Sequence, residues 1–124
     1  MSKILIVDDN VNTCFLVKSF LEEMGHDVIV SHYGIDAMEK VKNLKPNIML
    51  LDMIIEGGMG GMEILRRVRQ FDNKICIIMI SALIDEVYRK KTLENGANEY
   101  ITKPFDYDHL NECIRNNTIM RNRK

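Results

Sequence analysis

The strongest constraint on the fold comes from two short apolar runs that show no polar alternation. Residues 48–51 (IMLL) lead directly to Asp52, and residues 75–80 (ICIIMI) lead to Ser81. A strand with one face in water alternates apolar and polar side chains, whereas a strand covered on both faces does not. The two runs therefore predict interior strands of a parallel sheet that carries helices on both faces.

Other segments alternate between strand-like and helix-like patterns along the whole chain. Apolar side chains recur every three or four residues between the strand-like runs, as they do in amphipathic helices. We expect strands at residues 3–7, 27–31, 47–52, 75–80 and 98–102, and helices at about residues 14–24, 34–44, 62–71, 84–94 and 107–120. Five strand–helix units with short connections predict an α/β fold, doubly wound around a five-stranded parallel sheet.

The same periodicity predicts which side of each helix faces the sheet. In the helix at 34–44, the inner side is expected to carry Ile35, Met38, Val41 and Leu44. Gly25, which follows the first helix, is expected to end it. Phe15 falls on the outer side of that helix, where a lone apolar residue usually has no special role.

Length and composition limit the architecture and the cell compartment. A chain of 124 residues, 46% hydrophobic and 28% charged, fits one globular domain, 1–124. Residues at about 119–124 form a basic tail, which we interpret as a solvated helix end. A net charge of −1 predicts no direct nucleic-acid binding. No apolar run reaches the roughly 20 residues of a membrane span, and charged Asp8 comes too early for a secretory signal, so we expect a cytoplasmic protein.

The cysteines do not form a recognisable metal or redox motif. Cys14, Cys76 and Cys113 are odd in number and widely spaced, unlike the paired cysteines of zinc sites. We expect them to be small buried side chains. The three histidines are equally scattered, and a surface or loop position is expected for each.

Polar residues follow four of the five expected strands. They are Asp8 and Asp9 after the first, Asp52 at the end of the third, Ser81 after the fourth and Lys103 after the fifth. Parallel strands end at one edge of the sheet, which is where ligands bind in open α/β folds. Three carboxylates placed together repel one another unless they share a cation, and oxygen ligands suit Mg²⁺. A lysine and a hydroxyl group beside them can hold a phosphoryl group on a carboxylate.

Each of these residues also has an ordinary structural interpretation. Asp9 or Asn10 can cap the first helix, and Ser81 can cap the fourth. Asp52 can be a turn residue and Lys103 a surface residue. Taken together, however, unrelated caps have no reason to occupy the strand ends along a single sheet edge.

With this arrangement, the chain resembles the receiver domain of two-component response regulators, single-domain and chemotaxis-receiver-like. The motifs are Asp8-Asp9, Asp52, Ser81-Ala82 and Lys103-Pro104-Phe105, and the resemblance covers essentially the whole chain. It implies a flavodoxin-like (βα)5 sandwich. It also implies a phosphoacceptor in a two-component phosphorelay, not an enzyme in the ordinary sense, although the domain takes part in phosphotransfer and its own dephosphorylation.

The resemblance further implies a role for each site residue. Asp52 would take a phosphoryl group from a histidine kinase or phosphotransfer protein. Asp8, Asp9, Asp52 and the backbone carbonyl of Ile54 would bind Mg²⁺ or Mn²⁺, Asp8 largely through water. Lys103 would pair with the phosphoryl oxygens, and Ser81 would hydrogen-bond to them in the active domain. In family members the Lys-Pro peptide is commonly cis, which here is Lys103-Pro104.

Phosphorylation would act by shifting the population of two conformations. Tyr100 matches the family's switch aromatic, which turns inward as the Ser81 hydroxyl moves. The output surface would comprise the fourth helix, fifth strand and fifth helix. Because no effector domain follows in this sequence, we expect the output to be contact with a downstream protein.

The chain departs from the family pattern in the segment after Asp52. The family often has proline where this chain has Glu56, and the glycine-rich segment Gly57-Gly58-Met59-Gly60-Gly61 holds one residue more than usual. These glycines are not a nucleotide-phosphate loop, because no Gly-Lys-Ser or Gly-Lys-Thr follows. Apolar Ile54 and Leu83 flank the expected phosphoryl site, and we expect them to limit water access and lengthen the phosphorylated lifetime.

Two other functions are compatible with the fold class. A flavodoxin-like cofactor binder shares the architecture, but Asp8 and Asp9 would repel a phosphate where such a site needs a glycine- or hydroxyl-rich loop. A receiver-like scaffold could bind proteins without being phosphorylated. The sequence leaves open the cognate kinase, the output partner and the oligomeric state.

Overall fold

The computed structural model describes the backbone of residues 2–122 and the side chains of residues 2–118. Strands and helices alternate from end to end, as predicted. The elements are β1 (Lys3–Val7), α1 (Val11–Glu23), β2 (Asp27–Ser31), α2 (Gly34–Leu44), β3 (Ile48–Asp52), α3 (Gly61–Phe71), β4 (Cys76–Ser81), α4 (Glu86–Glu94), β5 (Glu99–Thr102) and α5 (Tyr107–Asn122). The side chains of the expected basic tail at 119–124 lie outside the described part.

The five strands form one parallel sheet in the order β2-β1-β3-β4-β5. Every residue of β3 and β4 is buried, which confirms that the two unalternating runs are interior strands. β3 is the middle strand, and β4 lies between β3 and the edge strand β5. Because all strands run the same way, the ends of β1, β3, β4 and β5 lie at one edge.

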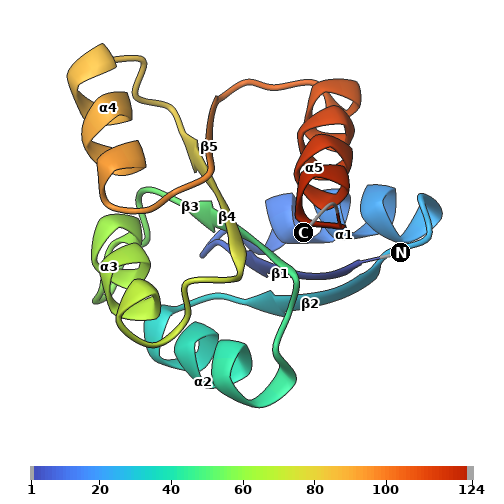
Figure 1. Ribbon diagram of the computed structural model, residues 1–124, viewed down its shortest axis with the longest axis horizontal. Coiled ribbons are helices and arrows are strands. Elements are labelled where there is room, and N and C mark those ends of the chain that lie inside the picture. The colour runs from blue at the N-terminus through green and yellow to red at the C-terminus, as the bar shows by residue number, and fades with distance from the viewer. Residues whose placement is uncertain (1, 123–124) are drawn as a thin grey trace.

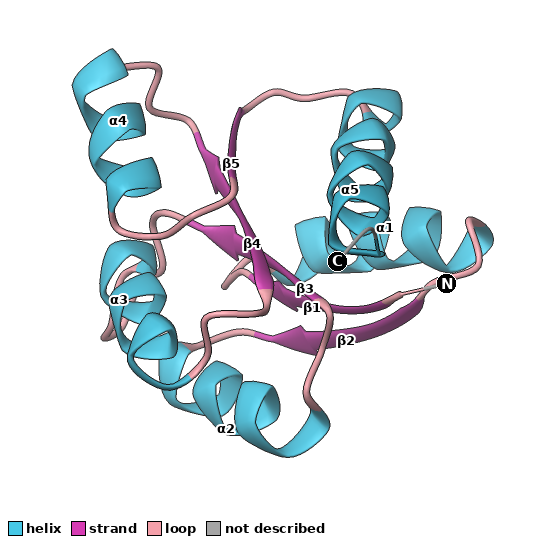
Figure 2. Ribbon diagram, in the orientation of Figure 1, coloured by secondary structure: helices cyan, strands magenta, loops and turns pink. Residues whose placement is uncertain are grey.

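Helices cover both faces of the sheet (Figure 1 and Figure 2). α1 and α5 lie on one face, and α2, α3 and α4 lie on the other. Each interface has its own hydrophobic core: Leu21 and Ile114 are fully or almost fully buried on the α1/α5 side, and Ala37 and Leu65 on the α2/α3/α4 side. The sheet therefore lies between two apolar layers, as a doubly wound architecture requires.

The prediction for the inner face of α2 was wrong at two positions. The side chains of Ile35 and Leu44 are 65% and 41% exposed, whereas the buried residues of the helix are Gly34, Ala37 and Val41. Small residues at 34 and 37 let the helix pack closely at those positions, and a search for large apolar residues overlooks them. Leu44 is the last residue of α2 and lies beyond the buried part of the helix.

Helix α4 begins later than expected and packs lightly. Asp85 is its N-cap, and its side chain accepts a hydrogen bond from the N–H of Val87 at 2.8 Å. Ser81 therefore does not cap the helix but is the last residue of β4. Within α4 only Thr92 is buried, and Val87 is 73% exposed. This helix thus has fewer buried residues than α1 or α3.

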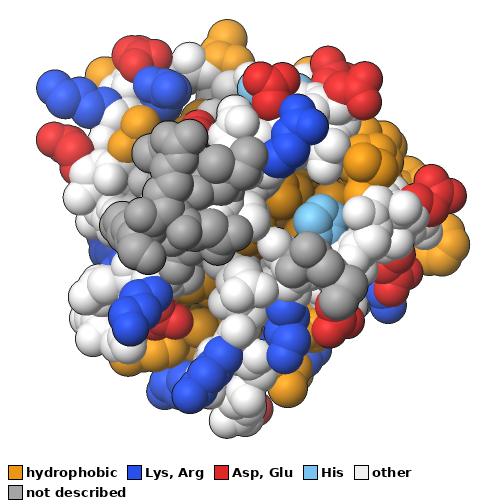
Figure 3. Space-filling view, turned by 45° about the vertical axis from the view of Figure 1, so that its right-hand side comes forward, with side chains coloured by type: hydrophobic (Ala, Val, Ile, Leu, Met, Phe, Trp, Pro, Cys, Tyr) orange, Lys and Arg blue, Asp and Glu red, His pale blue; other side chains and the backbone are white. Residues whose placement is uncertain are grey.

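The surface carries charges of both signs. On the described part of the face in Figure 3, Lys and Arg side chains are interspersed with Asp and Glu, in keeping with the net charge of −1. Among the described helices, none is long and apolar enough to cross a lipid bilayer.

Candidate functional site

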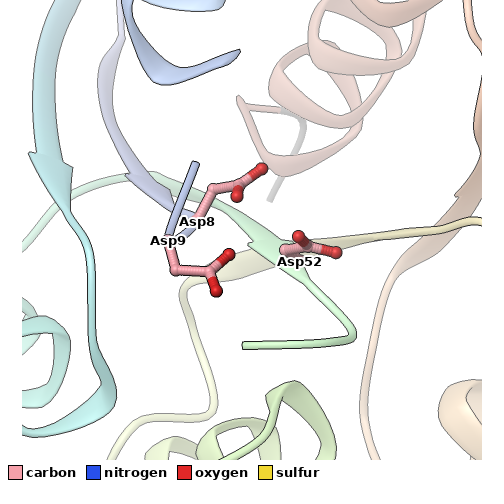
Figure 4. Close-up of side chains that lie close together, drawn as sticks. All are labelled: Asp8, Asp9 and Asp52. Atoms are coloured by element: carbon pink, nitrogen blue, oxygen red, sulfur yellow. The ribbon is translucent and has the colours of Figure 1, made fainter. Parts of the chain in front are cut away.

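Three carboxylates converge at the edge where β1 and β3 end. One oxygen each from Asp8, Asp9 and Asp52 lies within 4.8 Å of the other two. Figure 4 shows the three side chains extending from adjacent chain segments into the same space. Asp8 and Asp52 are buried, and Asp9 is half-buried. The structure thus brings together the three acids that the sequence analysis selected.

The parallel sheet places the two buried acids. β1 and β3 are adjacent, and Val7 pairs with Leu51, so the next residue of each strand reaches the same level of the sheet. The N–H of Asp8 continues the β1–β2 pairing by donating to the Ser31 carbonyl at 3.1 Å. Beyond Asp52, the N–H of Met53 donates to the Ile80 carbonyl of β4 at 2.8 Å. Both acids therefore lie on backbone that the sheet fixes.

Backbone N–H groups hold the carboxylates in place. Asp8 Oδ1 accepts a hydrogen bond from Asn10 at 2.8 Å, and Asp9 Oδ2 accepts one from Glu56 at 3.0 Å. Asp52 Oδ1 lies 3.4 Å from the N–H of Ile54. Asn10, and not Asp9, caps α1, because its Oδ1 accepts the Thr13 N–H at 2.9 Å. Asp9 is thus free of the capping role and faces the other acids.

Lys103 supplies a positive charge beside the acids. Its Nζ lies 3.3 Å from Asp52 Oδ2 and 3.9 Å from Asp8 Oδ2. The backbone N–H of Lys103 donates to the Ser81 carbonyl at 2.7 Å, so β4 fixes the start of the lysine side chain. The Lys103-Pro104 peptide is cis, as expected from the resemblance.

The Asp8 carboxyl group is electrostatically unfavourable in its charged form. Burial raises its pKa above the ordinary value of 3.8, and the negative charges of Asp52 and Asp9 raise it further. The Asn10 N–H and the Lys103 ammonium group oppose this shift but do not cancel it. A divalent cation among the three acids would stabilise the charged form.

Ser81 and Tyr100 contact the same backbone segment beside the acids. Ser81 is buried, and its hydroxyl oxygen accepts a hydrogen bond from the Leu83 N–H at 3.0 Å. The Tyr100 ring is buried, and its hydroxyl donates to the Leu83 carbonyl at 2.8 Å. The two residues are therefore joined through one peptide segment at the start of the β4–α4 connection.

The segment between β3 and α3 closes the site on another side. Gly57 and Gly58 have φ values of +80° and +146°, which other residues rarely adopt. A Cβ atom at Gly61 would overlap the carbonyl oxygen of Asp52. The glycines thus let the chain turn and pass close to β3, and the turn carries the Glu56 N–H to Asp9.

An apolar groove opens next to Lys103. It has a volume of about 510 Å³, and its lining includes Leu16, Pro104, Phe105 and Tyr107. Other apolar side chains of α1 are also exposed, among them Val11 and Phe15, at 63% and 67%. Phe15 is exposed, as predicted, but the groove itself was not predicted.

A family model described as the response regulator receiver domain matches residues 4–115. The chain belongs to this family. The fold agrees: a CheY-like receiver domain protein from Methanospirillum hungatei JF-1 superimposes with a TM-score of 0.93, at 26% sequence identity over 99% of this chain and 98% of that one. The predictions of the family and of the flavodoxin-like (βα)5 fold are therefore confirmed.

Two relatives from Bacillus subtilis (strain 168) differ in how much of their length corresponds to this receiver domain. The chain is 34% identical to the alkaline phosphatase synthesis transcriptional regulatory protein PhoP over 113 residues, which are 91% of this chain and 47% of PhoP. It is 33% identical to sporulation initiation phosphotransferase F over 113 residues, which are 91% of this chain and 90% of that protein. The receiver thus spans about half of the first relative and most of the second.

Membership in the family shows a phosphoacceptor type of domain and not an ordinary enzyme. The acid cluster is of the kind that binds Mg²⁺ in receivers. The individual roles of Asp8, Asp9, Asp52, Ile54, Ser81, Tyr100 and Lys103 remain predictions. Two contacts of the site were not predicted, the Glu56 N–H on Asp9 and the His32 ring on the Asp8 carbonyl. Neither has a side-chain pattern that could have revealed it.

Proposed function

We propose that this receiver domain, residues 1–124, accepts a phosphoryl group on Asp52 from a phosphohistidine of a histidine kinase or phosphotransfer protein. The observation that carries the proposal is the convergence of the Asp52 carboxylate with Lys103 and with two further acids. The relative named sporulation initiation phosphotransferase F supports a place in a phosphorelay.

The chemistry assigned to Asp52 is nucleophilic. One carboxylate oxygen attacks phosphorus and forms an O–P bond, while the N–P bond of the phosphohistidine breaks and the released imidazole takes up a proton. Lys103, whose Nζ is 3.3 Å from Asp52 Oδ2, offsets the negative charge of the phosphoryl oxygens. We assign to the Ser81 hydroxyl, which accepts the Leu83 N–H in this structure, a hydrogen bond donated to a phosphoryl oxygen after phosphorylation.

The acids fit a divalent metal. Asp8, Asp9 and Asp52, with the Ile54 carbonyl, would hold Mg²⁺ or Mn²⁺, because hard oxygen ligands suit these ions. The pKa of Asp8 is raised by burial and, to a lesser extent, by the charges of Asp52 and Asp9, and a bound cation would offset these effects. When bound, the ion supplies positive charge for the phosphoryl oxygens.

The groove beside Lys103 is the docking place proposed for the phosphodonor. Leu16 on α1 and Phe105 beyond β5 line this groove together with Lys103. Val11 and Phe15 on α1 add exposed apolar side chains. A helix that presents its phosphohistidine can lay an apolar face on this surface. The output partner is proposed to bind α4, β5 and α5. Val87 on α4 is 73% exposed, and Ile84, just before this helix, is 83% exposed.

The direct test is incubation with Mg²⁺ and a small-molecule phosphodonor, followed by intact-mass measurement. We expect wild type to gain the mass of one phosphoryl group, and Asp52→Asn or wild type with excess chelator to gain none. Equal labelling of Asp52→Asn would contradict the assignment of Asp52. No labelling of wild type would favour the scaffold function over phosphorylation.

A further inference from the structure

The backbone carbonyl of Asp8 is held by two side chains from outside its own strand. It lies just beyond β1, where strand pairing ends, and Asp8 is buried. The ring Nδ1 of His32 lies 3.0 Å from this oxygen, and the Cys14 thiol donates to it at 3.3 Å. Buried carbonyls need a hydrogen-bond partner, and these two side chains provide it.

The Asp8 carbonyl determines which ring nitrogen of His32 acts as the donor in this contact. A carbonyl oxygen only accepts hydrogen bonds, so Nδ1 must carry the proton in the contact with Asp8. His32 follows β2, whose last residue, Ser31, accepts the Asp8 N–H. Ser31 and His32, at the end of β2, therefore contact both the N–H and the carbonyl group of Asp8.

The hydrogen bonds to the Asp8 carbonyl affect both acids, because Asp8 and Asp9 are joined by one rigid peptide group. The Asp8 carbonyl and the Asp9 nitrogen belong to the same planar peptide, so fixing the carbonyl fixes the orientation of the whole plane. That plane joins the Cα atoms from which the Asp8 and Asp9 side chains extend. Orientation of the plane thus sets where the two carboxylates lie relative to Asp52.

We propose that His32 is a positioning residue for divalent-metal binding, acting through the Asp8–Asp9 peptide. The proposal rests on the metal site of the proposed function, and it adds a residue that contacts neither the metal nor the phosphoryl group. Partners that orient the groups around a metal typically contribute 10- to 100-fold in affinity, and we expect an effect at about the lower end, tenfold.

The test is calorimetric titration of the full chain with Mg²⁺ alone, in the absence of a phosphodonor. His32→Leu removes the donor and keeps a side chain of similar size. His32→Asn restores it, because the amide Nδ2 of asparagine is bonded to Cγ just as Nδ1 of histidine is. The matched control is His109→Leu, which removes an exposed histidine on α5.

We expect His32→Leu to raise the Kd for Mg²⁺ about tenfold, and His32→Asn and His109→Leu to stay within about twofold of wild type. Nitrogen NMR of metal-free wild type at pH 8 should show the proton of His32 on Nδ1. Unchanged affinity in His32→Leu, equal weakening in His32→Asn, or a proton on Nε2 would each overturn the proposal.

A purely structural role gives a different pattern. Thermal unfolding of the metal-free variants would then separate His32→Leu from wild type while Mg²⁺ affinity stayed the same, and that result counts against positioning. Failure of wild type itself to bind Mg²⁺ would overturn the metal site and the role of His32 together. If wild type binds Mg²⁺ and His32→Leu binds it with the same affinity, only the role of His32 is overturned.

Discussion

Asp8 combines a cost to folding stability with a proposed role in metal binding. Its folded pKa is raised above 3.8, chiefly by burial, so the unfolded chain releases this proton at a lower pH than the folded chain does. The contribution of Asp8 to stability is therefore most favourable below pH 3.8 and is lost as pH rises through the raised pKa. Ionisation of Asp8 therefore lowers the stability of the metal-free protein.

Asp8→Asn should consequently stabilise the metal-free protein while weakening its metal site. At pH 7 with chelator present, we expect an unfolding free energy higher by on the order of 1 kcal/mol, which corresponds to a melting temperature about 4 °C higher. The gain should shrink as the pH approaches 4. Glu39→Gln, on the exposed side of α2, is the control for a lost negative charge. Destabilisation by Asp8→Asn at pH 7 would refute this electrostatic explanation.

Ile54 is an apolar residue two positions after the proposed phosphoacceptor. Its N–H lies 3.4 Å from Asp52 Oδ1, and its side chain is 57% exposed. Because an apolar group there limits the approach of water, Ile54→Asn should shorten the phosphorylated half-life, by about threefold. The measurement is loss of phosphoryl mass after the donor is removed. Leu44→Asn, an exposed position at the end of α2, should leave the half-life unchanged, and slower loss in Ile54→Asn would contradict the idea.

At the scale of elements, Arg69 of α3 forms hydrogen bonds with the connection between α4 and β5. The Arg69 guanidinium donates to the Gly96 carbonyl at 2.9 Å, the Asp72 carbonyl at 3.1 Å and Asn98 Oδ1 at 2.9 Å. Asn98 Oδ1 also accepts the Ile77 N–H of β4 at 2.8 Å. The C-terminal end of α4 is therefore tied to α3 and β4, whereas its N-terminal end is exposed at Val87.

Arg69→Met should lower the unfolding free energy by about 2 kcal/mol, since it removes several charge-assisted hydrogen bonds. The matched control is Arg67→Met, two residues earlier on the same helix. It removes an ion pair with Glu63 in which both side chains are about half exposed, at 50% and 49%, so its cost should stay below about 1 kcal/mol. Urea unfolding measures both, and equal losses would show that the tie at Arg69 has no special weight.

For the helices and strands, the features predicted correctly were those that depend on the order of apolar and polar residues along the chain. The buried strands β3 and β4 followed from unbroken apolar runs, and the convergence of acids followed from their position at parallel strand ends. The inner face of α2 was mispredicted because Gly34 and Ala37 pack by being small. The path of the glycine segment was not predictable either, since glycine permits many backbone conformations and only tertiary contacts select one.

The hydrogen bond from the Glu56 N–H to Asp9 is a backbone contact, which residue types alone do not predict. Its N–H donates to Asp9 Oδ2 at 3.0 Å, and proline, which the family often has here, has no N–H to donate. In the sequence, Glu56 is only a departure from the family pattern. In the folded chain its nitrogen holds one of the three acids.

At the scale of the whole molecule, the Leu83 peptide segment links the acid cluster to α4. Ser81 accepts its N–H at 3.0 Å, and Tyr100 donates to its carbonyl at 2.8 Å. A phosphoryl group that recruits the Ser81 hydroxyl would release the Leu83 N–H. The lightly packed α4 would then respond, because a small free-energy change is enough to shift its position.

Phosphorylation should therefore alter amide hydrogen exchange in α4 (Glu86–Glu94) in wild type, and Ser81→Ala should abolish that change while still accepting the phosphoryl group. Ser19→Ala, whose hydroxyl donates to the Phe15 carbonyl on α1, should respond like wild type. An α4 response of full size in Ser81→Ala would show that the signal does not pass through this hydroxyl.

The measurement that tests the central claim most directly is the location of the phosphoryl group in the phosphorylated chain. Borohydride reduces an acyl phosphate to the alcohol, so the modified aspartate is marked permanently and can be found by peptide mass spectrometry. We expect the mark on Asp52 alone, and only in samples that contained Mg²⁺ during phosphorylation. A mark on Asp8 or Asp9, or equal marking in chelator, would contradict the account.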